Sequence, residues 1–126
     1  MTNYDNYSTI RGWNKHAYTI ETVIIEEGIT TIGSGAFEDC INLKSVTLPS
    51  TLTSIGNKAF SQCSELTSIT IPDSVTTIEV QAFNGCQSLT SITLPAGIER
   101  IEWSVFADCT NLSTVTLPDS ITTISS

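Results

Sequence analysis

The chain has few of the residues on which catalysis and nucleic-acid binding depend. Its 126 residues include one histidine, five basic residues and four cysteines. Thirteen acidic residues bring the formal net charge to −8, which opposes a phosphate backbone or an anionic membrane as a partner. We therefore expect no nucleic-acid binding.

Catalytic and cofactor motifs are also missing from the sequence. The one histidine, His16, stands near the N-terminus, and we expect it at the surface of a leading segment. The glycines in Gly33-Ser34-Gly35 lack the strand-to-helix context of a phosphate-binding loop. The sequence predicts neither an enzyme nor a bound cofactor.

Long apolar runs are absent as well. No apolar run reaches the roughly 18 residues that a membrane-spanning helix needs. The first five residues lack the basic start and the apolar stretch of a signal peptide. We expect no membrane insertion and no exporting or anchoring segment within this stretch.

The sequence does contain a strict repeat of 23 residues. The cysteines Cys40, Cys63, Cys86 and Cys109 keep this step, and so do Pro49, Pro72, Pro95 and Pro118. A fixed period of this length indicates a solenoid, in which similar coils stack on one another.

Apolar residues recur at the same places in every coil. The clearest columns are Ile32, Ile55, Ile78 and Ile101; Phe37, Phe60, Phe83 and Phe106; Leu43, Leu66, Leu89 and Leu112; and Val46, Ile69, Ile92 and Val115. Four full coils span residues 26–117, with partial coils at both ends. We divide the chain into a lead-in or capping segment, residues 1–16, and a solenoid, residues 17–126.

Each coil is predicted to contain two extended pieces and one tight turn. In the first full coil, Val46 and Leu48 alternate with polar residues, as in a strand with one buried face, and Pro49 ends that strand. Gly33 and Gly56 are expected to allow a sharp bend before a short helical or 3₁₀ turn that places the phenylalanine in the core. Successive coils should form parallel ladders about 4.8 Å apart.

The repeat resembles the BspA-like class of leucine-rich repeats over residues 17–124. The resemblance lies in the pattern Cys-x-x-Leu-x-x-Ile/Val-x-Leu/Ile-Pro-x-x-Leu/Ile/Val-x-x-Ile-x-x-x-Ala-Phe-x-x-Cys, and residues 1–13 resemble the stretch that leads into such arrays. It implies a right-handed solenoid, a bacterial cell-surface or secreted location, and a role in adhesion or protein binding. Late in the array Glu79 and Glu102 replace the glycines, and Val105 replaces an alanine, so we expect a different turn there.

The four cysteines invite a zinc site or disulfides, but a ladder opposes both. Zinc needs four sulfurs that converge at about 2.3 Å, whereas a ladder spreads them over some 14 Å. Parallel Cα–Cβ bonds leave neighbouring Cβ atoms about 5 Å apart, where a disulfide needs about 3.8 Å. We expect buried free thiols and no metal.

Serine and threonine form a regular grid on one predicted face. Its members are Thr47, Thr70, Thr93 and Thr116, with Ser45, Ser68, Ser91 and Thr114 beside them. β-Branched threonine suits an exposed strand for structural reasons alone. A flat hydroxyl array could also recognise a glycan or an ice surface, although carbohydrate sites usually add aromatic residues, which this face lacks.

A second candidate surface lies where the period breaks. Val80 and Trp103 occupy a column that is polar in other coils, and they should lie side by side in adjacent coils. Such a pair either marks a contact site or packs on a neighbouring loop. Glu79 and Glu102, near Glu99, are either a weak calcium site or solvated carboxylates beside Arg100.

Taken together, these features predict a non-catalytic protein-binding or adhesion module. Its ligand would be a protein or a glycan, and the alternatives are ice or polysaccharide binding through the hydroxyl grid, or a structural spacer without a ligand. Ile121 and Ile124 have no following coil and no polar cap, which predicts a fragment of a longer chain or end-to-end self-association through the C-terminal coil.

Overall fold

A computed structural model gives the fold and describes residues 9–10, 20–98, 100–102, 104–121 and 123–124. The described part contains ten short strands, and no helix in it is long and apolar enough to cross a membrane. The strands are β1 (Thr9–Ile10), β2 (Thr22–Ile24), β3 (Thr31–Ile32), β4 (Ser45–Thr47), β5 (Ser54–Ile55), β6 (Thr77–Ile78), β7 (Ser91–Thr93), β8 (Arg100–Ile101), β9 (Thr114–Thr116) and β10 (Thr123–Ile124).

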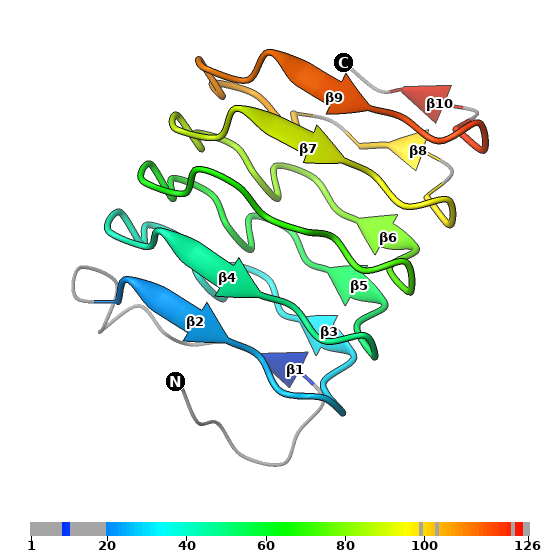
Figure 1. Cartoon of the computed structure of the whole chain (residues 1–126), viewed down its shortest axis with the longest axis horizontal. Helices are drawn as coiled ribbons and strands as arrows, with labels where there is room; N and C mark the ends of the chain where they lie inside the picture. Colours follow the sequence, from blue (N-terminus) through cyan, green and yellow to red (C-terminus); the bar gives the residue numbers. More distant parts are fainter. Residues whose placement is uncertain (1–8, 11–19, 99, 103, 122, 125–126) are drawn as a thin grey trace.

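The strands line two walls of a stack of coils. Strands β2, β4, β7 and β9 lie on one wall, here called the front, and the other six lie on the back wall (Figure 1). Every pair is parallel, and like residues face each other: Val23 lies opposite Val46, and Ile32 opposite Ile55. The predicted parallel-strand solenoid is confirmed.

The core consists of columns of identical or similar side chains. The rings of Phe37, Phe60, Phe83 and Phe106 stack with centroids 5.4, 5.5 and 6.0 Å apart and nearly parallel planes. Column residues of the interior coils, such as Leu66 and Leu89, are fully buried. Burial of these columns supplies the main stabilising free energy, because a single coil cannot bury its own apolar face.

The turn between the back and front walls forms a third ladder. Within a coil, hydrogen bonds join residues three apart, as from Ala36 N to Gly33 O (3.2 Å) and from Cys40 N to Phe37 O (3.2 Å). Between these bonds, alternate amides donate to the next coil, as from Phe37 N to Ala59 O (2.8 Å). In the described residues this segment is a series of tight turns rather than a continuous helix.

The bend begins at Gly33 and Gly56, where the first turn is closed by bonds from Ala36 N to Gly33 O (3.2 Å) and from Ala59 N to Gly56 O (3.1 Å). The left-handed residues are not Gly33 and Gly56 but two other columns, Gly35, Lys58, Gln81 and Ser104, and Asp39, Gln62, Gly85 and Asp108, with φ between 57° and 76°. Because neither column includes the glycine-to-glutamate changes, the third coil keeps the same turn, and Ala82 N bonds to Glu79 O (3.2 Å). The expectation of a different turn late in the array is therefore corrected.

Burial decreases toward the C-terminal end of the stack. Ile69 is 7% exposed, whereas Val115, in the same column, is 37% exposed and Leu117 is 42% exposed. The N-terminal end differs, because Val23 and Ile25 of the first front rung are buried. The C-terminal end therefore leaves a set of core positions open to solvent.

Candidate functional site

The predicted serine and threonine grid lies on the front wall and is exposed. We call it the hydroxyl face; its members are Ser45, Thr47, Ser68, Thr70, Ser91, Thr93, Thr114 and Thr116. Strict alternation along each front strand places these side chains outward and the intervening Val46, Ile69 or Ile92 inward. The outward orientation that the sequence alternation predicts is therefore present in the structure.

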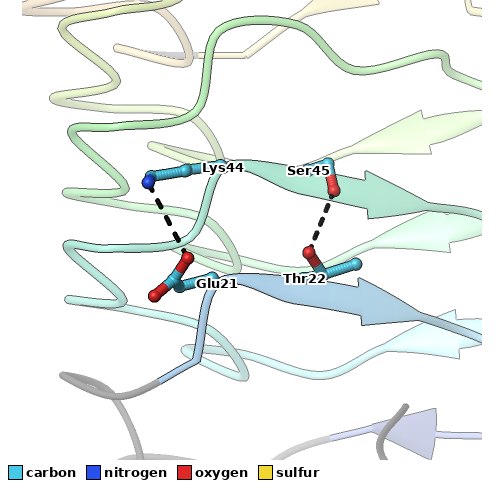
Figure 2. A network of polar contacts seen from close by, with 4 residues as sticks. All are labelled: Glu21, Thr22, Lys44 and Ser45. Carbon is cyan, nitrogen blue, oxygen red and sulfur yellow. Dashed lines mark hydrogen bonds and ion pairs between the residues drawn. The ribbon is translucent and has the colours of Figure 1, made fainter.

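Strands β2 and β4, the first two on the front wall, show which contacts stabilise the regular part of this wall. Lys44 Nζ lies 3.7 Å from Glu21 Oε1, and Ser45 Oγ donates to Thr22 Oγ1 at 3.5 Å (Figure 2). The charged pair is exposed, so its contribution to stability is small. The main-chain bonds of β2 with β4 determine the spacing here.

The front ladder is interrupted in the middle of the stack. Strands β2 and β4 form one sheet and β7 and β9 another, and the coil between them crosses the front wall without an arrow (Figure 1). Ile25 N bonds to Thr47 O and Leu94 N to Thr116 O, both at 3.0 Å, whereas residues 68–71, all of them described, make no backbone bond to either neighbouring rung. We call residues 68–71 the front interruption.

A hollow lies on each side of the front interruption. The larger hollow, of about 620 Å³, is lined by residues 68–71 and by residues 91–94 of the next coil. Its polar lining residues include Ser68, Thr70, Ser91, Thr93 and Asp73. The smaller, of about 410 Å³, is lined by Thr47, Thr70 and Glu27 among others. Thr70 borders both hollows, so the hydroxyl face is not a flat array.

The turns that follow the front strands form an acidic edge. In residues 26–28, 49–51, 72–74, 95–97 and 118–120, all described, the charged residues are Glu26, Glu27, Asp73 and Asp119, and none is basic. Ser50 donates its N–H to Glu27 Oε2 (2.9 Å) and its hydroxyl to Oε1 (2.7 Å). These two bonds hold the pKa of the Glu27 carboxyl below its ordinary value.

The structure brings only part of the period-breaking surface together. Arg100 Nε pairs with Glu102 Oε2 at 3.2 Å, beside a back-wall hollow of about 310 Å³ where the β3-β5-β6 ladder stops short of β8. Val80 is half-buried, and Trp103 and Glu99 lie outside the described residues, as does His16. Among the described residues no three His, Cys, Asp or Glu side chains are placed to hold a metal ion, and the candidate calcium site includes a third carboxylate, Glu99, that is not among them.

The cysteines are free thiols that face the core. Cys63 Sγ lies 3.3 Å from Phe37 O, and Cys86 Sγ lies 3.2 Å from Phe60 O, so each thiol donates to a carbonyl of the preceding coil. Burial, aided by the nearby Asp39 carboxylate, raises the pKa of Cys40 to about 11. Burial likewise raises the pKa of Cys63. A buried, protonated thiol is a poor nucleophile, which is consistent with a packing role.

Comparison with known families agrees with this geometry. The sequence profile described as BspA type leucine rich repeat region matches residues 14–126 in six copies. The chain belongs to the BspA-type leucine-rich-repeat family. This BspA-type chain has no match among curated proteins.

Several solved structures resemble this BspA-type chain. A leucine-rich cell surface protein from Faecalibacterium prausnitzii is 42% identical, with a TM-score of 0.84, over 94% of this chain and 32% of that one. The leucine-rich-repeat protein of T. pallidum is 32% identical, with a TM-score of 0.76, over 79% of this chain and 47% of the other. The pneumococcal vaccine antigen PcpA is 25% identical over 95% of this chain and 30% of its own, with a TM-score of 0.69. The BspA-type chain thus spans 30–47% of the length of these proteins.

Sequence reasoning missed the front interruption and its hollows. Ser68-Ile69-Thr70 at the interruption has the same three residues as Ser91-Ile92-Thr93 in β7. No local signal distinguishes the unpaired rung from the paired one, so the feature arises from how the coils stack.

Proposed function

We propose that this chain is a non-catalytic protein-binding or adhesion module that takes its ligand on the hydroxyl face. The observation that carries the proposal is the pair of hollows beside Thr70 on an exposed wall of a rigid scaffold. A hollowed polar surface with an apolar floor offers both shape and hydrogen-bonding groups to a partner protein.

The proposal also includes location at the cell surface or outside the cell. The F. prausnitzii structure is described as that of a cell surface protein, and it shares 42% of aligned residues with this chain. The interrupted front ladder disfavours an ice or crystalline polysaccharide ligand, because such a surface requires a regular, flat array of hydroxyl groups.

Binding to a panel of purified extracellular proteins and an array of glycans, measured by biolayer interferometry, tests this function. For a protein that binds, Thr93→Tyr should weaken association by about tenfold, since a hot-spot substitution in a hollow costs more than about 1 kcal/mol. The matched control Thr53→Tyr changes an exposed threonine on the back wall and should leave binding within about twofold.

Three results would contradict the proposal. They are a panel without any bound protein, equal effects of Thr93→Tyr and Thr53→Tyr, and capture confined to glycans. The last would assign the hydroxyl face to carbohydrate recognition instead.

A further inference from the structure

The front interruption leaves main-chain groups unpaired that a regular ladder would use. In the paired rungs, amides such as Ile25 N and Leu94 N donate to the next rung. The corresponding amides Leu48 N and Ile71 N, both in the described part of the chain, have no backbone acceptor on the neighbouring rung. Residues 68–71 and the edges of β4 and β7 that face them therefore offer donors and acceptors that the sheet does not use.

The floor beneath these groups is closed. Ile69 and Ile92 are 7% and 3% exposed, so the core remains covered where the rungs separate. A ligand consequently lies over the interruption and does not insert between the rungs. Thr70, which borders both hollows, marks the centre of this surface.

The chemistry of the surface suits an extended peptide. A peptide main chain presents alternating donors and acceptors, which can hydrogen-bond the hydroxyl groups of Ser68, Thr70, Ser91 and Thr93 in the larger hollow. Both hollows are lined without any aromatic side chain, so they lack the platforms on which sugar rings commonly stack.

Charge determines which kind of peptide fits best. The acidic edge borders both hollows, through Asp73 at the larger and Glu27 at the smaller, and neither hollow has a basic lining residue. The net charge of the chain is −8. An acidic peptide would be repelled, whereas lysine or arginine side chains would be attracted to this edge.

We propose that the front interruption is the docking site for an extended, basic segment of a partner protein. The main chain of the segment lies over the interruption and hydrogen-bonds the outward-facing hydroxyl groups of the larger hollow, and its cationic side chains reach Asp73 and Glu27. This inference rests on the proposed function and specifies the partner for the same hydroxyl face.

Fluorescence anisotropy with three labelled synthetic peptides, (Lys-Thr)₅, (Gln-Thr)₅ and (Glu-Thr)₅, tests the docking site on the intact chain. The basic peptide should bind at least about tenfold more tightly than the neutral one, and the acidic peptide should not bind. Binding should weaken at high salt, because the ion pairs are exposed to solvent.

Two matched pairs of variants locate the site. Asp73→Lys should weaken binding of the basic peptide by about tenfold, whereas Glu65→Lys, an equal change of charge at an exposed position that lines neither hollow, should change it by less than about twofold. Thr70→Tyr should block the site, whereas Thr116→Tyr, in the same column but outside the hollows, should not. Thermal unfolding followed by circular dichroism verifies that each variant is folded.

Equal losses in Asp73→Lys and Glu65→Lys would overturn the proposal, since binding would then report only net charge. So would equal effects of Thr70→Tyr and Thr116→Tyr. If a panel protein binds and Thr93→Tyr weakens it while Asp73→Lys does not, the adhesion role stands and the basic-peptide site falls. If the basic peptide shows the predicted pattern but no panel protein binds, the adhesion role falls.

Discussion

At the scale of single residues, the cysteine column shows how a small polarisable side chain closes each coil. Cys109 Sγ lies 3.1 Å from Phe83 O, repeating the bonds that Cys63 and Cys86 make with the phenylalanine one coil earlier. The sequence predicted free, buried thiols, because a straight ladder can neither converge on a metal nor reach disulfide geometry. It did not predict the carbonyl acceptors, which belong to the turn of another coil.

Burial of the Cys40 thiol predicts a loss of stability at alkaline pH. Cys40 ionises near pH 9 when unfolded and near pH 11 when folded, so between these values the native state holds a proton that the unfolded state has lost. The contribution of Cys40 is fully present below pH 9 and decreases by about 1.4 kcal/mol per pH unit between the two pKa values.

Urea unfolding at pH 7.5, 9 and 10.5 measures this effect. In Cys40→Ala, part of the decrease with pH should disappear, although the variant starts from a lower stability at pH 7.5 because of the cavity that it leaves. An unchanged pH dependence in Cys40→Ala would contradict this assignment.

At the scale of elements, one column of hydroxyl groups ties successive coils together at the acidic edge, in the turns between the front and back walls. Thr51 Oγ1 donates to Ile29 O (2.8 Å) and Ser120 Oγ to Ile98 O (2.8 Å), and Ser74 Oγ donates to Leu52 O in the same way. Gly97 stands in this column without a hydroxyl group, and it borders the back-wall hollow where the ladder stops.

Gly97→Ser should restore the missing bond, to Val75 O, and stabilise the chain. A Cβ atom at this position would lie 3.3 Å from Val75 O and 3.2 Å from Thr76 Cγ2, so the threonine must shift slightly. The backbone here needs no left-handed conformation. We expect the serine variant to exceed the alanine variant, Gly97→Ala, in stability by about 1 kcal/mol, which is the net contribution of a typical hydrogen bond.

Urea unfolding measures the free energy of unfolding of both variants. Because both replace glycine, the entropic effect of that replacement is common to them, and the difference between them reports the hydrogen bond alone. Equal stability of the two variants would show that the hydroxyl group finds no acceptor.

Elements also show where sequence reasoning reaches its limit. The period identified the columns, the strand walls and the hydroxyl face, because side-chain alternation and burial repeat with the same step. It did not predict the left-handed conformations of Lys58 and Gln81, because glycine is the residue that normally adopts them. At Asp39, Lys58 and Gln62 a backbone bond to the next coil holds this conformation in place.

At the scale of the whole molecule, the two ends of the stack differ. Interior coils are covered on both sides, the first front rung is buried, and the last one exposes Val115 and Leu117. Exposed core positions next to the unpaired edge of β9 favour association with a surface of the same kind.

We therefore expect the 126-residue stretch, when studied by itself, to self-associate through its last coil in a concentration-dependent manner. Sedimentation velocity should show an increasing mean mass with concentration, and Leu117→Asp should reduce the association constant by about tenfold or more. The neighbouring Thr116→Asp, whose side chain already faces solvent, should have little effect. A single monomeric species at every concentration would contradict this expectation.

The sequence by itself determined the solenoid, the coil length, the buried columns and the side on which the hydroxyl groups lie, because a strict period forces equivalent residues into equivalent places. Only the tertiary structure decided where the ladders break. Ser68-Ile69-Thr70 and Ser91-Ile92-Thr93 are identical locally, yet one is unpaired and the other lies in β7. Whether two rungs come within hydrogen-bonding distance depends on how all the walls of neighbouring coils pack together. The hollows of the candidate site are therefore a property of the stack as a whole.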